Sequence, residues 1–124
     1  MTQEDRNLLL KDLCARLPYE TLVAIAIGST DGLQWDNITL TPYLLYTTEE
    51  ESGFEYIKPY LRPMSGMTDK EKEWIRDNFD YVESFGVKCY DKVPEYYDWL
   101  NAHHFDYRGL IEKGLALEAP KGMY

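Results

Sequence analysis

The stretch "TLVAIAIGSTDGLQWDNITLT", residues 21–41, decides the fold class of this chain. Residues 21–28 are rich in β-branched side chains, which favour extended backbone, and they end at Gly28. Residues 29–32, "STDG", contain an Asp-Gly pair, which is typical of a tight hairpin turn because it tolerates positive φ. A second strand pattern follows over residues 33–41. The stretch therefore predicts a β-hairpin.

Two further segments predict strands beyond this hairpin. "YLLYTTEE", residues 43–50, follows Pro42, which we interpret as an edge, a bulge or a corner of the sheet. "FEYIKPYL", residues 54–61, follows the charged turn "EEESG", residues 49–53. About four short strands joined by tight turns predict a small antiparallel sheet or a partly open barrel.

An amphipathic helix is predicted before the sheet, over residues 3–17. Thr2 supplies a weak cap, apolar side chains recur at helical spacing, and Pro18 stops the run. Cys14 falls among these apolar positions, so we expect it to be a buried free thiol. The helix should therefore pack its apolar side on the rest of the protein.

Two more helices are predicted after the sheet. Residues 62–68 form a connector, and Thr68 with Glu71 makes a capping box for a helix over residues 69–79. Residues 81–93 are ambiguous between a loop and a short strand. Pro94 is a natural first residue for the next helix, over about residues 94–104.

The only histidines of the chain, His103 and His104, end that last helix. Helical spacing places His103 in the apolar stripe and His104 at its edge. Asp106 then caps a short fourth helix over residues 107–113, which Gly114 ends in a left-handed conformation, as in a Schellman motif. The pattern predicts a helix-corner-helix. We interpret the two histidines as filling its elbow, with a catalytic base or a ligand as the alternative reading.

Composition predicts one domain, residues 1–124. At 124 residues and 44% hydrophobic, the chain is long enough to build a core without metal or disulfide support. The first residues show neither a basic leader nor a long apolar run, so we expect no signal peptide, no membrane span and a cytoplasmic location in a bacterial cell.

Charge argues against direct nucleic-acid binding. Thirteen basic residues against 22 acidic ones give a net charge of −9, and this field repels phosphates. The same charge suits a protein partner with a basic surface. The candidate partner-binding residues are Glu49, Glu50 and Glu51 in the predicted turn and Asp69, Glu71 and Glu73 on the predicted helix.

No motif predicts a cofactor, a metal ion or catalysis. Cys14 and Cys89 lie far apart without metal-ligand spacing, and adjacent histidines do not readily place both rings on one ion. The sequence contains no phosphate-binding glycine loop, dinucleotide turn, zinc-protease helix or serine-centred elbow. We therefore expect a protein that is not an enzyme and has no catalytic residues.

One segment combines positive charge with tyrosine. In an extended strand, Lys58, Tyr60 and Arg62 would alternate onto one face. Together with Arg108 they could hold a phosphate or a carboxylate, helped by stacking on the tyrosine. This is the candidate ligand-binding set for an anionic small molecule. The alternative is that these cations pair with the many carboxylates of the chain.

Three strings carry a resemblance: "LLLKDLCARLPY", "IKPYLRPMSGMT" and "WLNAHHFDYRGLIEKGLALEAP". Together they resemble a group of short uncharacterised proteins from gut anaerobic bacteria, their prophages and mobile elements. The group offers no catalytic residues to carry over. The resemblance implies a phage or mobile-element gene, a setting in which small acidic proteins often inhibit host defence systems. We therefore expect an accessory protein that binds a host protein, the alternative being a binder that sequesters an anionic nucleotide signal.

Overall fold

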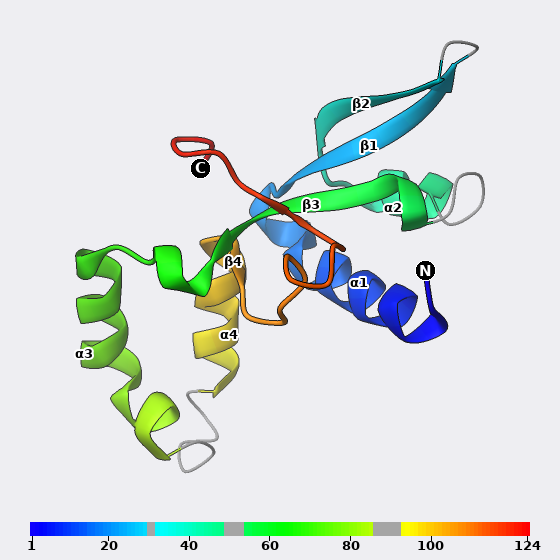
Figure 1. Cartoon of the computed structure of the whole chain (residues 1–124). Coiled ribbons are helices and arrows are strands. Elements are labelled where there is room, and N and C mark those ends of the chain that lie inside the picture. Colours follow the sequence, from blue (N-terminus) through cyan, green and yellow to red (C-terminus); the bar gives the residue numbers. More distant parts are fainter. Residues whose placement is uncertain (30–31, 49–53, 86–92) are drawn as a thin grey trace.

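The computed structural model describes residues 1–29, 32–48, 54–85 and 93–124 (Figure 1). The expected α+β class is confirmed, with an N-terminal helix and a small sheet that is not closed into a barrel. The described helices and strands, in chain order, are α1 (Gln3–Arg16), β1 (Leu22–Ser29), β2 (Gly32–Thr39), α2 (Pro42–Thr47), β3 (Ile57–Pro63), α3 (Asp69–Phe85), α4 (Val93–Ala102), β4 (Phe105–Asp106) and β5 (Leu117–Glu118).

The predicted hairpin is confirmed. β1 and β2 pair antiparallel, from Leu22 opposite Thr39 to Ser29 opposite Gly32. Residues 30 and 31 of the expected turn lie outside the described part of the chain. In Figure 1 the hairpin extends away from α1, α3 and α4, with β2 on its outer side. The hairpin thus forms one end of the molecule.

The sheet is mixed, whereas the sequence predicted an antiparallel one. Its order is β2-β1-β3-β4, and β5 also pairs with β3. β1 and β3 run antiparallel, but β3 is parallel to β4 (Arg62 opposite Phe105) and to β5 (Tyr60 opposite Leu117). Parallel pairing needs a long connection, which α3 and α4 supply between β3 and β4. β4 and β5 are only two residues long each, so the sequence has no periodic pattern from which their parallel pairing with β3 could be predicted.

The strand predicted over residues 43–50 is wrong, because residues 42–47 form the helix α2. Thr41 is its N-cap: the Thr41 hydroxyl accepts a hydrogen bond from the Leu44 amide at 3.1 Å, and Pro42 occupies the first turn. Thr-Pro is a helix-start signature, and the local cap outweighed the strand propensity of the tyrosines and threonines. Residues 49–53, the expected charged turn, lie outside the described residues.

The fourth predicted strand is confirmed with shifted ends. Residues 54–56 form a 3-10 turn, and β3 begins at Ile57 and continues to Pro63. Inside it, buried side chains alternate with half-buried ones, as a strand with one covered face requires.

The capping box of α3 is confirmed by two reciprocal hydrogen bonds. The Glu71 amide donates to the Thr68 hydroxyl at 3.2 Å, and the Thr68 amide donates to the Glu71 carboxylate at 2.9 Å. The helix is longer than predicted, since it runs to Phe85 across a non-helical residue, Phe79. Of the segment that the sequence left ambiguous, residues 81–85 are helical and residues 86–92 lie outside the described part.

The elbow after α4 is a corner, but the fourth helix predicted over residues 107–113 does not form. The Asp106 carboxylate accepts hydrogen bonds from the Leu110 and Ile111 amides, at 2.8 and 2.9 Å, and so holds a single turn. Gly114 then has a φ of +74°, and the Leu115 amide donates to the Leu110 carbonyl. The Schellman motif is therefore present at the end of one turn instead of a helix.

Two hydrophobic clusters hold these elements together. The larger one joins α1 to the sheet and includes Leu9, Leu13, Val23 and Leu61. The smaller one joins α3 and α4 to β4 through Ile75, Phe79, Leu100 and Phe105. Cys14 belongs to neither: it is exposed, so the expectation of a buried thiol is wrong. The buried polar positions Asp12 and Arg16 take the inner side of α1 beside Leu13 instead.

Candidate functional site

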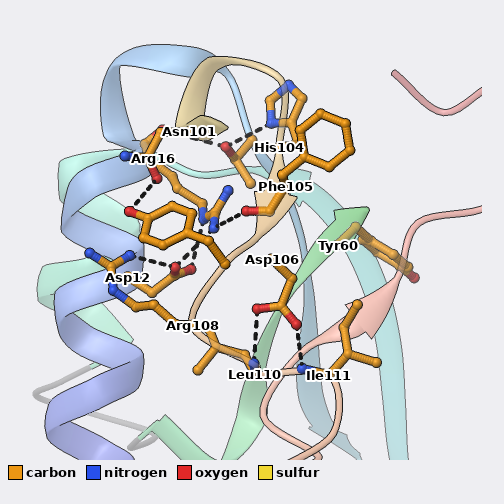
Figure 2. Close-up of polar contacts among 12 residues, drawn as sticks. Asp12, Arg16, Tyr60, Asn101, His104, Phe105, Asp106, Arg108, Leu110 and Ile111 are labelled. Atoms are coloured by element: carbon orange, nitrogen blue, oxygen red, sulfur yellow. Dashed lines mark hydrogen bonds and ion pairs between the residues drawn. The ribbon is translucent and has the colours of Figure 1, made fainter. Parts of the chain in front are cut away.

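A buried ionic cluster links α1 to the segment after β4 (Figure 2). Asp12 and Arg16 are one helical turn apart and both are completely buried. The Asp12 carboxylate accepts hydrogen bonds from Arg16 Nε at 2.8 Å and Nη2 at 3.0 Å, and from Arg108 Nη1 at 2.8 Å. One carboxylate is thus shared by two guanidinium groups, which leaves the cluster with an excess positive charge.

Arg16 also connects this cluster to the elbow. Its Nη2 donates to the Phe105 carbonyl at 2.7 Å, while its Nη1 has no hydrogen-bond partner among the described residues although it is buried. Sequence reasoning missed both Asp12 and Arg16. The available signal was an acid and a base with i, i+4 spacing on the apolar side of the helix, a pattern that a solvated surface pair also produces.

His104, not His103, is the buried histidine of the elbow. Its backbone has a left-handed φ of +64°, and its Nδ1 lies 3.2 Å from the hydroxyl of Thr21, the residue before β1. Burial, together with the nearby Arg16 guanidinium, lowers the pKa of His104 to about 4. His103 is half-buried and stacks on Trp99. The predicted inward direction of His103 assumed that the helix continued, but α4 ends at Ala102.

The predicted alternation of Lys58, Tyr60 and Arg62 is present in β3. Lys58 Nζ lies 6.0 Å from the ring centre of Trp35, and the Tyr60 hydroxyl donates to Asn37 Oδ1 at 2.9 Å. Both neighbours belong to β2, so these side chains cover one face of the sheet.

Arg62 and Arg108 do not complete a common site with them. Arg62 forms a two-point ion pair with Glu71, at 2.6 and 2.9 Å. Lys58, Arg62 and Arg108 line three different pockets, of about 280, 480 and 420 Å³ respectively. The structure therefore does not bring the four predicted ligand-binding residues together.

The predicted acidic residues have different surroundings. Asp69 and Glu73 are exposed on α3. Glu71 is half-buried, and its hydrogen bonds from Arg62 lower its pKa to about 2. This carboxylate is therefore part of the α3–β3 connection and is not a free surface charge. Glu49, Glu50 and Glu51 lie outside the described residues.

Exposed large apolar side chains that the sequence reasoning missed lie on β2 and α2, with Trp35 and Ile38 on opposite faces of the strand because they are three positions apart. β2 is at the edge of the sheet, and all of its side chains from Gln34 to Thr39 are exposed. Among them are two large apolar ones, Trp35 at 45% and Ile38 at 42% exposure. Tyr43 and Tyr46 of α2 are exposed to 76% and 63%. We call Trp35, Ile38, Tyr43 and Tyr46 the aromatic edge.

The charge of the chain is concentrated around the same segment. Residues 17–57 contain no lysine, arginine or histidine, but they contain seven of the acidic residues. These are Glu20, Asp31, Asp36, Glu49, Glu50, Glu51 and Glu55. The aromatic edge is thus set in the most acidic part of the sequence.

Among the described residues, no group of three or more histidine, cysteine or carboxylate side chains could hold a metal ion. Within the same part of the chain, no helix is long and apolar enough to cross a membrane. Comparisons with protein-family models, curated proteins and solved structures give no match.

Proposed function

We propose that this chain is a non-enzymatic binding protein that docks on a partner protein with a basic surface through the aromatic edge. The observation that carries the proposal is the exposure of Trp35 and Ile38 on an edge strand within a sequence segment that has acidic but no basic residues, the nearest cation described being Lys58 of β3 beside Trp35. Large exposed apolar side chains surrounded by polar ones are characteristic of interaction sites, and tryptophan and tyrosine are enriched in protein interfaces.

The edge strand itself supports a protein partner over a small ligand. Within the described part of the chain, β2 has a neighbouring strand only on the β1 side, so its outer backbone groups can pair with an added strand. Soluble proteins usually protect such an edge with lysine or proline, and β2 contains neither. Acidic side chains would attract a basic partner, while the aromatic edge would supply the contact area that holds it.

The resemblance to prophage and mobile-element proteins suggests where this partner is found. In our proposal the chain is an accessory protein in a bacterial cytoplasm, and its partner is a host protein, for example a component of a defence system. A basic, nucleic-acid-binding surface on such a component would have the charge that the acidic segment complements.

The alternative function, capture of an anionic nucleotide signal by Lys58, Tyr60, Arg62 and Arg108 together, has less support. Lys58, Arg62 and Arg108 line separate pockets, and Arg62 is already bound at two points by Glu71. A ligand bound by all four would have to bridge separate pockets and displace Glu71 from both Nη atoms of Arg62.

Capture from a bacterial lysate tests the docking proposal with three immobilised forms. These are the natural chain, the double variant Trp35→Ser/Ile38→Thr and the control Met64→Ser, which changes an exposed apolar residue away from the aromatic edge. We expect one basic protein to be retained by the natural chain and the control but lost from the double variant. Its retention should fall as the salt concentration rises, because the distance over which charges attract one another shortens to about 8 Å at physiological ionic strength.

Binding kinetics with the purified partner separate the contribution of the acidic residues from that of the aromatic edge. Changing Glu49, Glu50 and Glu51 to glutamine should slow association, whereas Trp35→Ser should speed dissociation. A captured protein that is acidic, that is insensitive to salt, or that the folded double variant retains equally well would contradict the proposal.

A further inference from the structure

A different part of the molecule, where α1 meets α4, contains a pocket that the docking proposal does not use. Its volume is about 420 Å³, within the range of roughly 300–1,000 Å³ that is usual for small-molecule sites. The lining residues are Lys11 and Ala15 of α1, Tyr97 and Asn101 of α4, and Tyr107 and Arg108 of the segment after β4.

The pocket is positively charged although the chain carries a net charge of −9. Lys11 and Arg108 line it, and no carboxylate is among the lining residues. Behind its wall, Asp12 is shared by Arg16 and Arg108, so these three side chains together carry a formal excess of one positive charge. Removing a charge from water without a counter-ion is unfavourable. An anion in the pocket would supply the missing negative charge.

Arg108 is placed to receive such an anion. Within the described part of the chain it makes one hydrogen bond, from Nη1 to Asp12, and this bond fixes the guanidinium beside the pocket. Its other nitrogen donors remain available for a ligand. Exposed Lys11, one residue before Asp12 on the same helix, adds a second cation at the rim. Together they resemble the paired cations that proteins use for phosphate and carboxylate groups.

The remaining walls suit a flat ring. Tyr97 and Tyr107 have ring centres 5.1 Å apart, and the Arg108 guanidinium lies 4.6 Å from the ring centre of Tyr107. The Tyr107 hydroxyl donates to Asn101 Oδ1 at 3.0 Å, which orients the side-chain amide of this buried asparagine. Tyrosine rings stack well on planar groups, and an oriented amide can recognise a polar ring edge.

We propose that this pocket binds a small organic anion that carries a planar ring, with the oxyanion at Arg108 and Lys11 and the ring beside the two tyrosines. Nucleoside monophosphates and aromatic carboxylates share this chemistry. The proposal is independent of docking through the aromatic edge, because it uses α1 and α4 in place of β2 and α2.

Calorimetric titration of the whole chain tests the pocket with four probes. Adenosine monophosphate and benzoate each combine a ring with an oxyanion, whereas adenosine has only the ring and inorganic phosphate only the anion. We expect at least one of the first two to bind at least about tenfold more tightly than both adenosine and phosphate. Which of the two binds better distinguishes a phosphate ligand from a carboxylate ligand.

Three variants locate the binding. Ala15→Met fills the pocket without changing any charge and keeps a good helix former, so it should abolish binding. Lys11→Gln should weaken it by roughly five- to tenfold through the loss of a charge-assisted contact. Lys72→Gln, which removes an exposed charge from α3, is the matched control and should leave affinity unchanged.

Two results would overturn the proposal. The first is that neither adenosine monophosphate nor benzoate binds at about 1 mM, a concentration at which even weak specific sites are occupied. The second is that Ala15→Met, with unchanged melting and circular dichroism, binds the probe as tightly as the natural chain does. In that case the anion is held elsewhere.

Discussion

The imidazole of His104 lies flat against the phenol ring of Tyr124, with ring centres 3.6 Å apart and planes inclined by 15°. The hydroxyl of the same tyrosine donates to the Tyr60 carbonyl at 2.8 Å and accepts from the Leu22 amide at 3.0 Å. Tyr124 therefore joins the elbow to β1 and β3, and its ring helps to shield His104 from water.

The burial of His104 makes stability depend on pH between about 6.5 and 4. The pKa of His104 is lowered from 6.5 to about 4 in the folded protein, so in this interval the unfolded chain binds the proton and the folded protein does not. Stability should be complete above pH 6.5 and fall as the pH decreases to 4, by at most about 3 kcal/mol. Asparagine tolerates positive φ, so the variant His104→Asn should fold. Its free energy of unfolding, measured by urea denaturation, should vary little with pH over this interval. An equally steep dependence in this variant would assign the effect to another group.

Two substitutions of Tyr124 separate its hydroxyl from its ring. Tyr124→Phe keeps the stack and loses the bonds to Leu22 and Tyr60, so unfolding free energy should fall by about 1 kcal/mol while the His104 pKa stays low. Tyr124→Ala also admits water to the imidazole, so the His104 pKa should rise toward 6.5. NMR titration of the imidazole measures both. An unchanged pKa in Tyr124→Ala would show that the ring does not shield it.

The Glu71–Arg62 ion pair should make stability depend on pH in a lower pH range than His104 does. The pKa of Glu71 is lowered from 4.5 to about 2, so its stabilising contribution is present above pH 4.5 and is lost as the pH falls to 2. Glu71→Gln should therefore cost about 1–2 kcal/mol at neutral pH, less than the full shift implies because both side chains are partly solvated. Glu73→Gln and Asp69→Asn, which change exposed carboxylates of the same helix, should be almost neutral. Equal melting temperatures for all three variants would contradict this assignment.

Asp12→Asn should destabilise the protein more than any of the substitutions above. It leaves Arg16 buried without a counter-charge and removes the partner of Arg108, so the expected loss is about 3–5 kcal/mol. Glu4→Gln, at an exposed position in the first turn of the same helix, should cost only a few tenths of a kcal/mol. Thermal denaturation of both variants measures the difference. A mild effect of Asp12→Asn would mean that the cluster relaxes or admits water.

Strong local signals were sufficient to predict much of the fold. The paired strands of the hairpin, the Thr68–Glu71 box and the positive φ of Gly114 each depend on neighbouring residues, and each is present as predicted. Prediction failed where two local signals compete, because Thr41 and Pro42 start a helix in a segment whose side chains favour a strand. Parallel pairing of β3 with β4 and β5 depends on residues that are far apart in sequence, so no local pattern indicates it.

The candidate sites were harder to predict, because they depend on which side chains meet in space. Alternation correctly placed Lys58, Tyr60 and Arg62 on one strand face, but it could not show that Arg62 forms an ion pair with Glu71. The exposure of Trp35 could not be predicted from the sequence either, since an apolar residue in a strand is more often buried. Asp12 and Arg16 have the spacing of an ordinary surface pair, and only the fold places Arg108 and Phe105 beside them.

The bonds that tie α1 and β1 to the elbow also set the order in which the chain can fold. Arg16 and Phe105 are 89 positions apart, and Leu22 and Tyr124 are 102 apart. The β1–β2 hairpin, in contrast, closes within its own residues and can form early. During synthesis, Asp12 and Arg16 must stay hydrated until residues 105–124 have been made. The hairpin needs none of these distant residues, so it can form before the core that anchors it.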